Sequence, residues 1–274
     1  MNKRKITIGF GELCRQIVKL KSSRYDPKRT ALFGKLIRVI KENDKRAPIS
    51  HRILTQTKHI LINDLRSTFS LEQISIEKYW AIKIISSKNP YDELKDFPFY
   101  KGYISSAKYL FDTISSMCKD PIRKMLYIGG GALPLNPILM QNKHNLTINL
   151  IERDNQSFTL SKKLLNTLKL NRKITVELSD IMDYKKLKNY DVIINAVLVG
   201  ETSVQKRKVI RHISKYMDTN TLLVFKNVDG LRTILYPSVK TQYFKDLKIK
   251  KVVKNPAQLT NILIFSKKVI KNST

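Results

Sequence analysis

The feature that most constrains the fold is a series of short apolar runs that begins near residue 122. The first run, Met125 to Ile128, leads into Gly129, Gly130 and Gly131, and the second ends at Glu152. Further runs of this kind lie at 174–178, 191–196, 221–225, 248–253 and 261–265. Because amphipathic stretches separate most of them, the pattern predicts a parallel sheet covered by helices. We therefore expect a Rossmann-like α/β domain over residues 119–274.

The first part of the chain has a different pattern, in which apolar residues recur mostly at helical spacing. This predicts an N-terminal helical domain over residues 1–118. The expected helices contain the stripes 13–20 and 32–40, then His51 to Leu65, a further helix through Ile84, and Tyr103 to Met117. Ser70, with Gln73 three residues later, is interpreted as the cap of the fourth of these helices.

The glycine turn and the acids that follow the strands predict a nucleoside site. Glycines let a backbone approach a ligand closely, and an acid about 20 residues further on suits ribose hydroxyls. Glu152 stands at that position, and Asp180 follows the next strand, where it accepts an adenine amino group or caps a helix. Asp154 is interpreted as a helix cap. In an open α/β sheet these strand ends, with 195–200, face the ligand.

Two other nucleotide-dependent classes fit the turn less well. A dinucleotide-binding dehydrogenase has a third glycine three residues after the second, where this chain has Pro134, and Pro137 follows. A base-modifying methyltransferase would be expected to have an Asn-Pro-Pro-aromatic turn, where this chain reads Asn195-Ala196-Val197-Leu198. Methyltransferases without that turn stay open.

Composition limits the remaining classes. The 274 residues carry a net charge of +30, which favours nucleic acid, although lysines spread along the whole length also follow from biased amino-acid usage. No apolar run reaches the roughly 18 residues of a membrane span, and acidic and basic residues interrupt the start, so we expect no membrane contact, no signal peptide and a cytoplasmic location. Cys14 and Cys118 offer neither a disulfide framework nor metal-ligand spacing.

Four motifs, in order along most of the chain, resemble the nicotianamine synthase family of plants and archaea and its bacterial opine-metallophore relatives. They are Phe97-Pro98-Phe99-Tyr100-Lys101-Gly102-Tyr103, Gly131-Ala132-Leu133-Pro134-Leu135, Asn195 to Gly200, and Asp229-Gly230-Leu231-Arg232 with Leu235-Tyr236-Pro237. Ala132 replaces a proline of the family pattern and Gly102 an asparagine. The resemblance implies a class I methyltransferase-like domain that binds S-adenosylmethionine.

The resemblance also implies the reaction. Family enzymes transfer the 3-amino-3-carboxypropyl (aminobutanoyl) group of S-adenosylmethionine to an amino-acid amine and release methylthioadenosine, in making a metallophore. The attacking amine must lose a proton, so a carboxylate or phenol nearby is the natural base. The resemblance points to Glu77 as base and to Tyr103 as the group that orients or relays the proton, with Tyr100 and Arg232 toward the substrate. The implied donor-binding residues are Gly129, Gly130, Gly131, Leu133, Pro134, Glu152, Asp180, Ala196 and Val197.

Each role has a plainer alternative. Glu77 could form a surface salt bridge with Lys78 or Lys83, Tyr103 could be a half-buried aromatic, and Arg232 could bridge a surface acid. We expect no catalytic metal, and a homodimer is possible. The acceptor would be a small amino acid; nucleic acid is not expected despite the charge. The second functional hypothesis is an S-adenosylmethionine-dependent RNA methyltransferase.

Overall fold

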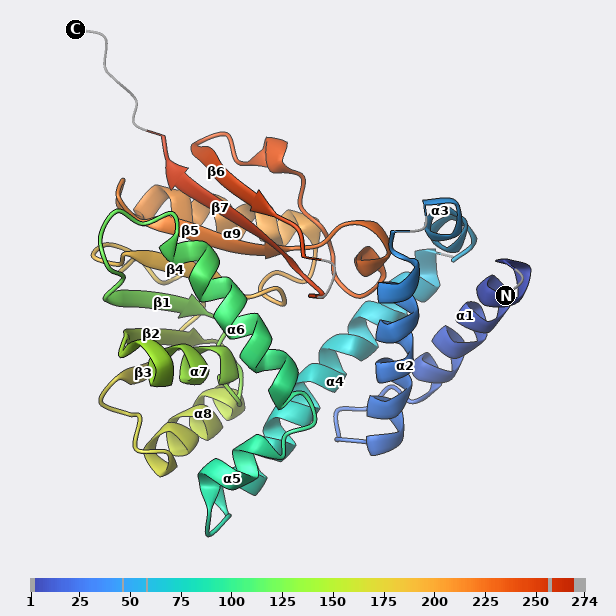
Figure 1. The fold of residues 1–274 in the computed structure, drawn as a ribbon, viewed down its shortest axis with the longest axis horizontal. Coiled ribbons are helices and arrows are strands. Elements are labelled where there is room, and N and C mark those ends of the chain that lie inside the picture. Colours follow the sequence, from blue (N-terminus) through green and yellow to red (C-terminus); the bar gives the residue numbers. More distant parts are fainter. Residues whose placement is uncertain (1–2, 46, 58, 256–257, 269–274) are drawn as a thin grey trace, which may run out of the picture. The chain divides into compact units, whose positions relative to one another are not determined.

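The structure, a computed structural model, describes residues 3–45, 47–57, 59–255 and 258–268 (Figure 1). It divides into two compact units, and the boundary falls inside one helix, after Ile76. The first unit comprises Met1–Ile76, Val228–Ser238 and Asn255–Asn261, and the second comprises Glu77–Asn227, Val239–Lys254 and Ile262–Thr274. The division into domains 1–118 and 119–274 stays a prediction.

The first unit is helical. Its elements are α1 (Lys3–Lys19), α2 (Pro27–Asn43), α3 (Ala47–Gln56), the greater part of α4 (His59–Ile85) and the 3-10 helix η1 (Gly230–Ile234). Asp26 caps α2 by accepting a hydrogen bond from the backbone N–H of Lys28 at 2.9 Å, and Pro27 occupies the first helical turn. Phe33 and Phe69 pack with ring centroids 4.9 Å apart in its core.

The sequence prediction placed the break between the third and fourth helices wrongly. The structure ends α3 at Gln56 and starts α4 at His59, so Ser70 lies within a 27-residue helix instead of capping one. The physical reason is that no glycine or proline occurs between His59 and Ile85, so nothing in the backbone stops the helix at Ser70.

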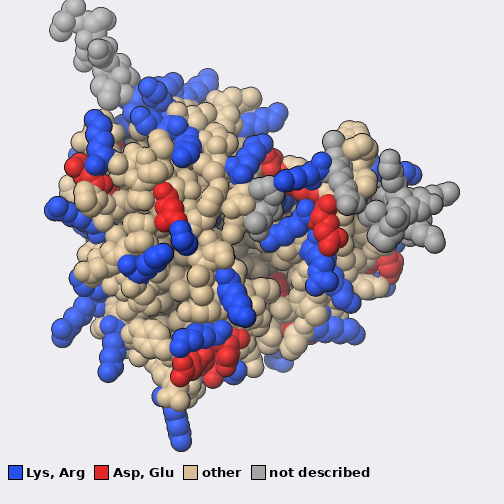
Figure 2. Space-filling view, in the orientation of Figure 1, with Lys and Arg blue, Asp and Glu red and all other residues tan. Residues whose placement is uncertain are grey.

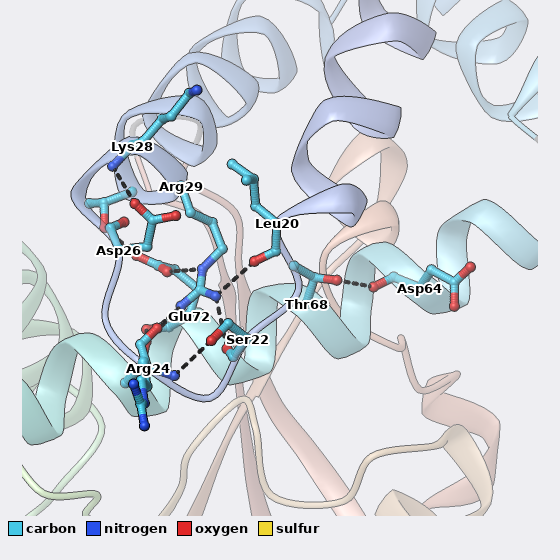
Figure 3. A network of polar contacts seen from close by, with 11 residues as sticks. Leu20, Ser22, Arg24, Asp26, Lys28, Arg29, Asp64, Thr68 and Glu72 are labelled. Carbon is cyan, nitrogen blue, oxygen red and sulfur yellow. Dashed lines mark hydrogen bonds and ion pairs between the residues drawn. The ribbon is translucent and has the colours of Figure 1, made fainter.

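A buried charge network fixes the turn between α1 and α2 (Figure 3). The guanidinium of Arg29, which is fully buried, donates to Glu72 Oε2 at 2.5 Å and to Ser75 Oγ at 3.0 Å. It also donates to the backbone carbonyls of Leu20, Ser22 and Arg24. An arginine has five N–H donors, and these contacts use all of them. Arg29 therefore holds the incoming chain against α4 without an unsatisfied donor.

The second unit is built on a seven-stranded sheet of order β3-β2-β1-β4-β5-β7-β6. The strands are β1 (Lys124–Ile128), β2 (Thr147–Glu152), β3 (Ile174–Leu178), β4 (Val192–Asn195), β5 (Leu222–Asn227), β6 (Leu247–Val253) and β7 (Asn261–Lys267). The helices are α5 (Pro90–Lys95), α6 (Tyr100–Ser115), α7 (Leu135–His144), α8 (Asn155–Thr167) and α9 (Ser203–Tyr216), with the 3-10 helix η2 (Thr241–Tyr243). The sequence pattern does not predict α5, because this helix of six residues buries a single side chain, Leu94, and so has no apolar stripe.

The pairing of the strands confirms the predicted fold class. Strands β1 to β5 pair in parallel, and β6 pairs with β7 antiparallel. In Figure 1, α6 passes in front of the strands and α9 lies behind them. The apolar face of α9, with Val209, Ile210 and Ile213, packs in one core with Leu126, Ile193 and Phe225 of the sheet. Strands buried on both faces are apolar along their length, which is the pattern that β1 and β4 show.

Strand β6 forms one edge of the sheet and is mostly exposed. Its sequence LKIKKVV places Lys248, Lys250 and Lys251 beside Ile249 and Val252, which are 43% and 46% exposed. A register irregularity interrupts its pairing with β7 between Ile249 and Lys251. Charged residues and bulges on an edge strand disfavour pairing with another chain.

We predict that Glu72→Met destabilises the chain by about 3–5 kcal/mol, because it leaves the buried Arg29 charge without its counter-ion. Urea unfolding measures the loss. The control is Glu12→Gln, which breaks an ion pair with Arg15 that is more than half exposed on both sides and should leave the unfolding midpoint unchanged. A loss for Glu72→Met below about 1 kcal/mol would contradict the importance of the network.

Candidate functional site

The turn after β1 has no room for side chains at Gly129 and Gly131. Gly129 and Gly131 have φ angles of +78° and +69°, which disfavour any residue with a Cβ. A Cβ on Gly129 would lie 2.6 Å from Val199 Cγ2, and one on Gly131 would overlap Glu77 Oε2. The glycines are therefore required because the turn closely approaches Glu77 of α4 and the loop after β4, which all belong to the second unit.

Glu152, at the end of β2, supports this turn directly. One carboxylate oxygen accepts from the Gly131 N–H at 2.8 Å, and the other accepts from the Asp154 N–H at 2.9 Å. The side chain is 9% exposed. Each carboxylate oxygen has a further lone pair, so these bonds leave acceptor capacity for ribose hydroxyls. The ribose role of Glu152 stays a prediction.

Glu77 enters the turn from α4. Burial, together with repulsion from the Glu152 carboxylate, raises the pKa of Glu77 to about 8, although hydrogen bonding by the backbone N–H groups of Ala132 and Leu133 favours the charged form. The alternative of a surface salt bridge is wrong, since Lys78 pairs with Asp154 at 2.9 Å and Lys83 with Glu93 at 2.5 Å. Glu77 is therefore a half-buried carboxyl group whose pKa is raised toward neutral pH.

The loop after β4, residues 196–200, lies on the other side of the glycine turn. The Ala196 N–H donates to Ile128 O at 3.1 Å, and Ala196 Cβ lies 3.5 Å from the position of a Cβ on Gly129. Ala196 and Val197 are half-buried, as is the glycine turn. The strand ends of β1, β2 and β4 thus bring together three of the four predicted ligand-facing segments.

The remaining predicted donor residues have structural partners of their own. Asp180 Oδ1 accepts from the Met182 N–H at 2.8 Å in a local turn, so its adenine role stays a prediction. Asp154 caps α8 through the Ser157 N–H, which confirms the expected cap. Leu133 and Pro134 are buried directly before the first residue of α7.

Tyr100 and Tyr103 lie in the first turn of α6, and both are half-buried. The Tyr103 ring packs against Phe97 with centroids 6.0 Å apart, and Phe97 packs against Trp80 at 5.8 Å. Trp80 is one helical turn from Glu77 on α4. Tyr103 is therefore linked to the Glu77 segment through aromatic packing, as part of the same unit.

Arg232 belongs to the first unit, where it is 4% exposed. Its Nη2 pairs with Asp44 Oδ2 at 3.1 Å, and its Nη1 donates to Asn261 Oδ1 at 3.2 Å. Asp44 also accepts from the Leu231 N–H at 2.8 Å. Arg232 thus bridges an acid, as the plainer alternative held, although the Asp44 side chain is only 11% exposed. Its contact with a substrate carboxylate stays a prediction.

Sequence reasoning did not single out Lys206, which is 1% exposed on α9. Its ammonium donates to Val197 O at 2.5 Å and to Val199 O at 3.2 Å. The signal was its position on the apolar stripe of α9, with Val209, Ile210 and Ile213, but it was one of many lysines. Within the described residues, no group of three or more His, Cys, Asp or Glu could hold a metal ion.

Comparison with known proteins identifies the chain. The family described as "Nicotianamine synthase protein" matches residues 5–273. The chain belongs to the nicotianamine synthase family. The resemblance inferred from the four motifs is thereby confirmed. Nicotianamine synthase 1 of Arabidopsis thaliana is 25% identical over 94% of this chain and 82% of its own length. Nicotianamine synthase of Solanum lycopersicum is 26% identical over 71% of this chain and 62% of its length.

Solved structures show the same fold. A crystal structure of a mutant of MtNAS has a TM-score of 0.80 and 21% identity, with 95% of this chain and 97% of that chain covered. MtNAS in complex with MTA and tNA has a TM-score of 0.79 and 22% identity, covering 95% and 97%. The fold of this nicotianamine synthase family member therefore includes the helical first part as well as the sheet.

We predict that Gly131→Ala destabilises this family member by more than about 1 kcal/mol, because it combines a positive φ with overlap of the Glu77 carboxylate. The matched control is Gly34→Ala in α2, where a Cβ would meet nothing within 4 Å. That change should stabilise the helix by about 0.5–1 kcal/mol. Thermal unfolding of both variants compares them, and equal midpoints would refute the proposed close approach.

Proposed function

We propose that this chain transfers the 3-amino-3-carboxypropyl group of S-adenosylmethionine to the amino group of an amino acid and releases methylthioadenosine. The observation that carries the proposal is the Glu77 carboxyl group seated against the glycine turn, in a chain that matches the nicotianamine synthase family over 5–273. Related structures support the donor, since MtNAS has been crystallised in one complex with S-adenosylmethionine and in another with MTA.

The reaction is a displacement at the carbon that joins the aminobutanoyl group to the sulfonium. The lone pair of the acceptor amine forms a new C–N bond, the C–S bond breaks, and its electron pair neutralises the sulfur of methylthioadenosine. The amine first gives up a proton, because an ammonium has no lone pair. Which carbon faces the amine decides whether this group or the methyl is transferred, so catalysis consists largely of positioning.

Glu77 suits the role of general base. A carboxyl group with a pKa of about 8 exchanges protons near neutral pH, where a base is most effective. The glycine turn fits a nucleoside donor, because Gly129 and Gly131 leave no Cβ and Glu152 retains acceptor capacity. Tyr103 is proposed to orient the acceptor or relay its proton, and Tyr100 and Arg232 are proposed to contact it.

The RNA methyltransferase alternative is not favoured. The family match covers residues 5–273, and nicotianamine synthase 1 of Arabidopsis thaliana aligns over 94% of the chain, so both include the helical part. On the face drawn in Figure 2, lysine and arginine side chains are dispersed, with groups of acids between them, instead of forming one continuous patch. A dispersed charge accords with biased composition better than with a nucleic-acid surface.

Further points remain part of the proposal. The product is proposed to be a nicotianamine-like metallophore with a role in metal homeostasis, which rests on the family and not on a metal site in the chain. A cytoplasmic location and a possible homodimer are also proposed. No helix among the described residues is long and apolar enough to cross a membrane.

We predict that purified chain incubated with S-adenosylmethionine and a panel of amino acids produces methylthioadenosine and an amino acid that carries an added aminobutanoyl group. Mass spectrometry detects both. The demethylated nucleoside with a methylated product, and no methylthioadenosine, would instead show a methyltransferase. Donor incubated without protein controls for spontaneous breakdown.

We predict that kcat/KM rises with pH and levels off above about 8, because the Glu77 carboxyl must lose its proton to act as base. Glu77→Gln should lower turnover by about 10²- to 10⁴-fold. The acceptor amine also titrates in this range, so the pH profile of Glu77→Gln is the control. If its profile matches that of the parent chain and turnover is unchanged, Glu77 is not the base.

A further inference from the structure

The loop 196–200 has an unusual support for a ligand-binding loop, because a buried lysine holds it from behind. Lys206 reaches back from the first turn of α9, and its ammonium bonds the carbonyls of Val197 and Val199. The Phe225 ring of β5 lies 5.6 Å from the ammonium. In the part of the chain that the structure describes, no acid forms an ion pair with Lys206.

Burying the Lys206 ammonium lowers the stability of the fold, which indicates that this lysine has a role other than stabilisation. A buried charge without a counter-ion loses its hydration, and burial lowers the pKa of Lys206 to about 8. An apolar side chain of similar length would fill the same space more cheaply. What an apolar side chain cannot do is hold two backbone carbonyls in fixed positions.

The close packing of Gly200 against Lys206 fixes the other end of the loop. Gly200 has a φ of +80°, and a Cβ there would lie 2.8 Å from the Lys206 backbone nitrogen. Asn195 Nδ2 donates to Ala196 O at 3.1 Å at the beginning of the loop. The loop is therefore tied at its start, at its middle and at its end.

The loop in turn touches the glycine turn. Val199 lies so close to Gly129 that a Cβ there would meet its Cγ2 at 2.6 Å. A shift of Val199 would change the space that the turn leaves for a ligand. The contacts thus form a sequence from the Lys206 ammonium through Val199 to Gly129.

The same geometry leaves donors on the outer side of the loop. In a trans peptide the C=O and the following N–H point in opposite directions, so the N–H groups of Leu198 and Gly200 point away from the Lys206 ammonium. Among the described residues these two N–H groups have no hydrogen-bond acceptor, and both residues are only half-buried. They are available to a ligand that carries acceptor atoms.

We propose that Lys206 is a positioning residue for the donor: it fixes the loop 196–200 so that the loop and the glycine turn together bind S-adenosylmethionine. The proposal rests on the proposed function in taking S-adenosylmethionine as the ligand. Lys206 acts through the carbonyls of Val197 and Val199 and takes no part in the transfer itself.

Isothermal titration calorimetry with S-adenosylmethionine tests the proposal. Lys206→Met keeps the length of the side chain but removes the ammonium, and it should weaken donor binding by about ten- to a hundredfold, as expected when one or two hydrogen bonds between the loop and the donor are lost. Lys206→Arg, which keeps charge and donors, should recover part of the affinity. The control Lys208→Met changes an exposed lysine of the same helix and should bind as the parent chain does.

Kinetics separates positioning from general damage. With Lys206→Met we expect a raised KM for S-adenosylmethionine and a kcat close to the parent value at saturating donor. Gly200→Ala disturbs the same loop from its other end and should raise the same KM. Unchanged donor affinity in a folded Lys206→Met would overturn the proposal, as would a lowered melting temperature in that variant together with normal donor affinity in Gly200→Ala.

Binding and turnover fail independently. If the parent chain binds S-adenosylmethionine but releases no methylthioadenosine with any acceptor, the proposed function fails while the calorimetric comparison of the Lys206 variants still decides the inference. If the parent chain releases methylthioadenosine and Lys206→Met binds donor normally, only the inference fails.

Discussion

The approach of the Glu77 carboxylate to the backbone of Gly131 is the constraint on which the site depends. It requires a left-handed glycine in the turn, a helix that delivers an acid to that point, and a second acid, Glu152, that accepts a hydrogen bond from the Gly131 N–H. Burial of the carboxyl group, together with repulsion from Glu152, raises the pKa of Glu77, so this shift follows from the same packing that builds the turn. The contact that fixes the backbone of the turn therefore also sets the acid–base behaviour of Glu77.

The first unit uses a similar contact for a different end. Gly230 also has a positive φ, and a Cβ there would overlap Asp44 Oδ1, which accepts from the next N–H and pairs with Arg232. There the carboxylate has an arginine as counter-ion, whereas no lysine or arginine in the described part of the chain forms an ion pair with Glu77. The two contacts thus share a backbone geometry and differ in the charges that surround the carboxylate.

The sequence predicted the sheet well, because strands buried on both faces, such as β1 and β4, are continuous apolar runs between clear turns. The glycine turn and the β4 loop were found for the same reason. The sequence-based prediction failed at the start of α4, where no glycine or proline marks the break between helices. Glu77 received a role only through the family resemblance, since local sequence patterns cannot show that this residue contacts Gly131. Lys206 was hidden by a composition rich in lysine.

The lysines of β6 show that part of the large positive charge has a local task in the sheet. The exposed Ile249 and Val252 would otherwise favour pairing of this edge with a strand of another chain. Lys248, Lys250 and Lys251 keep the edge hydrated. Replacing these lysines by alanine would remove the charges and leave the apolar side chains of the edge exposed. On this strand such a replacement would favour aggregation through the exposed edge, so surface lysines should be substituted on the helices instead.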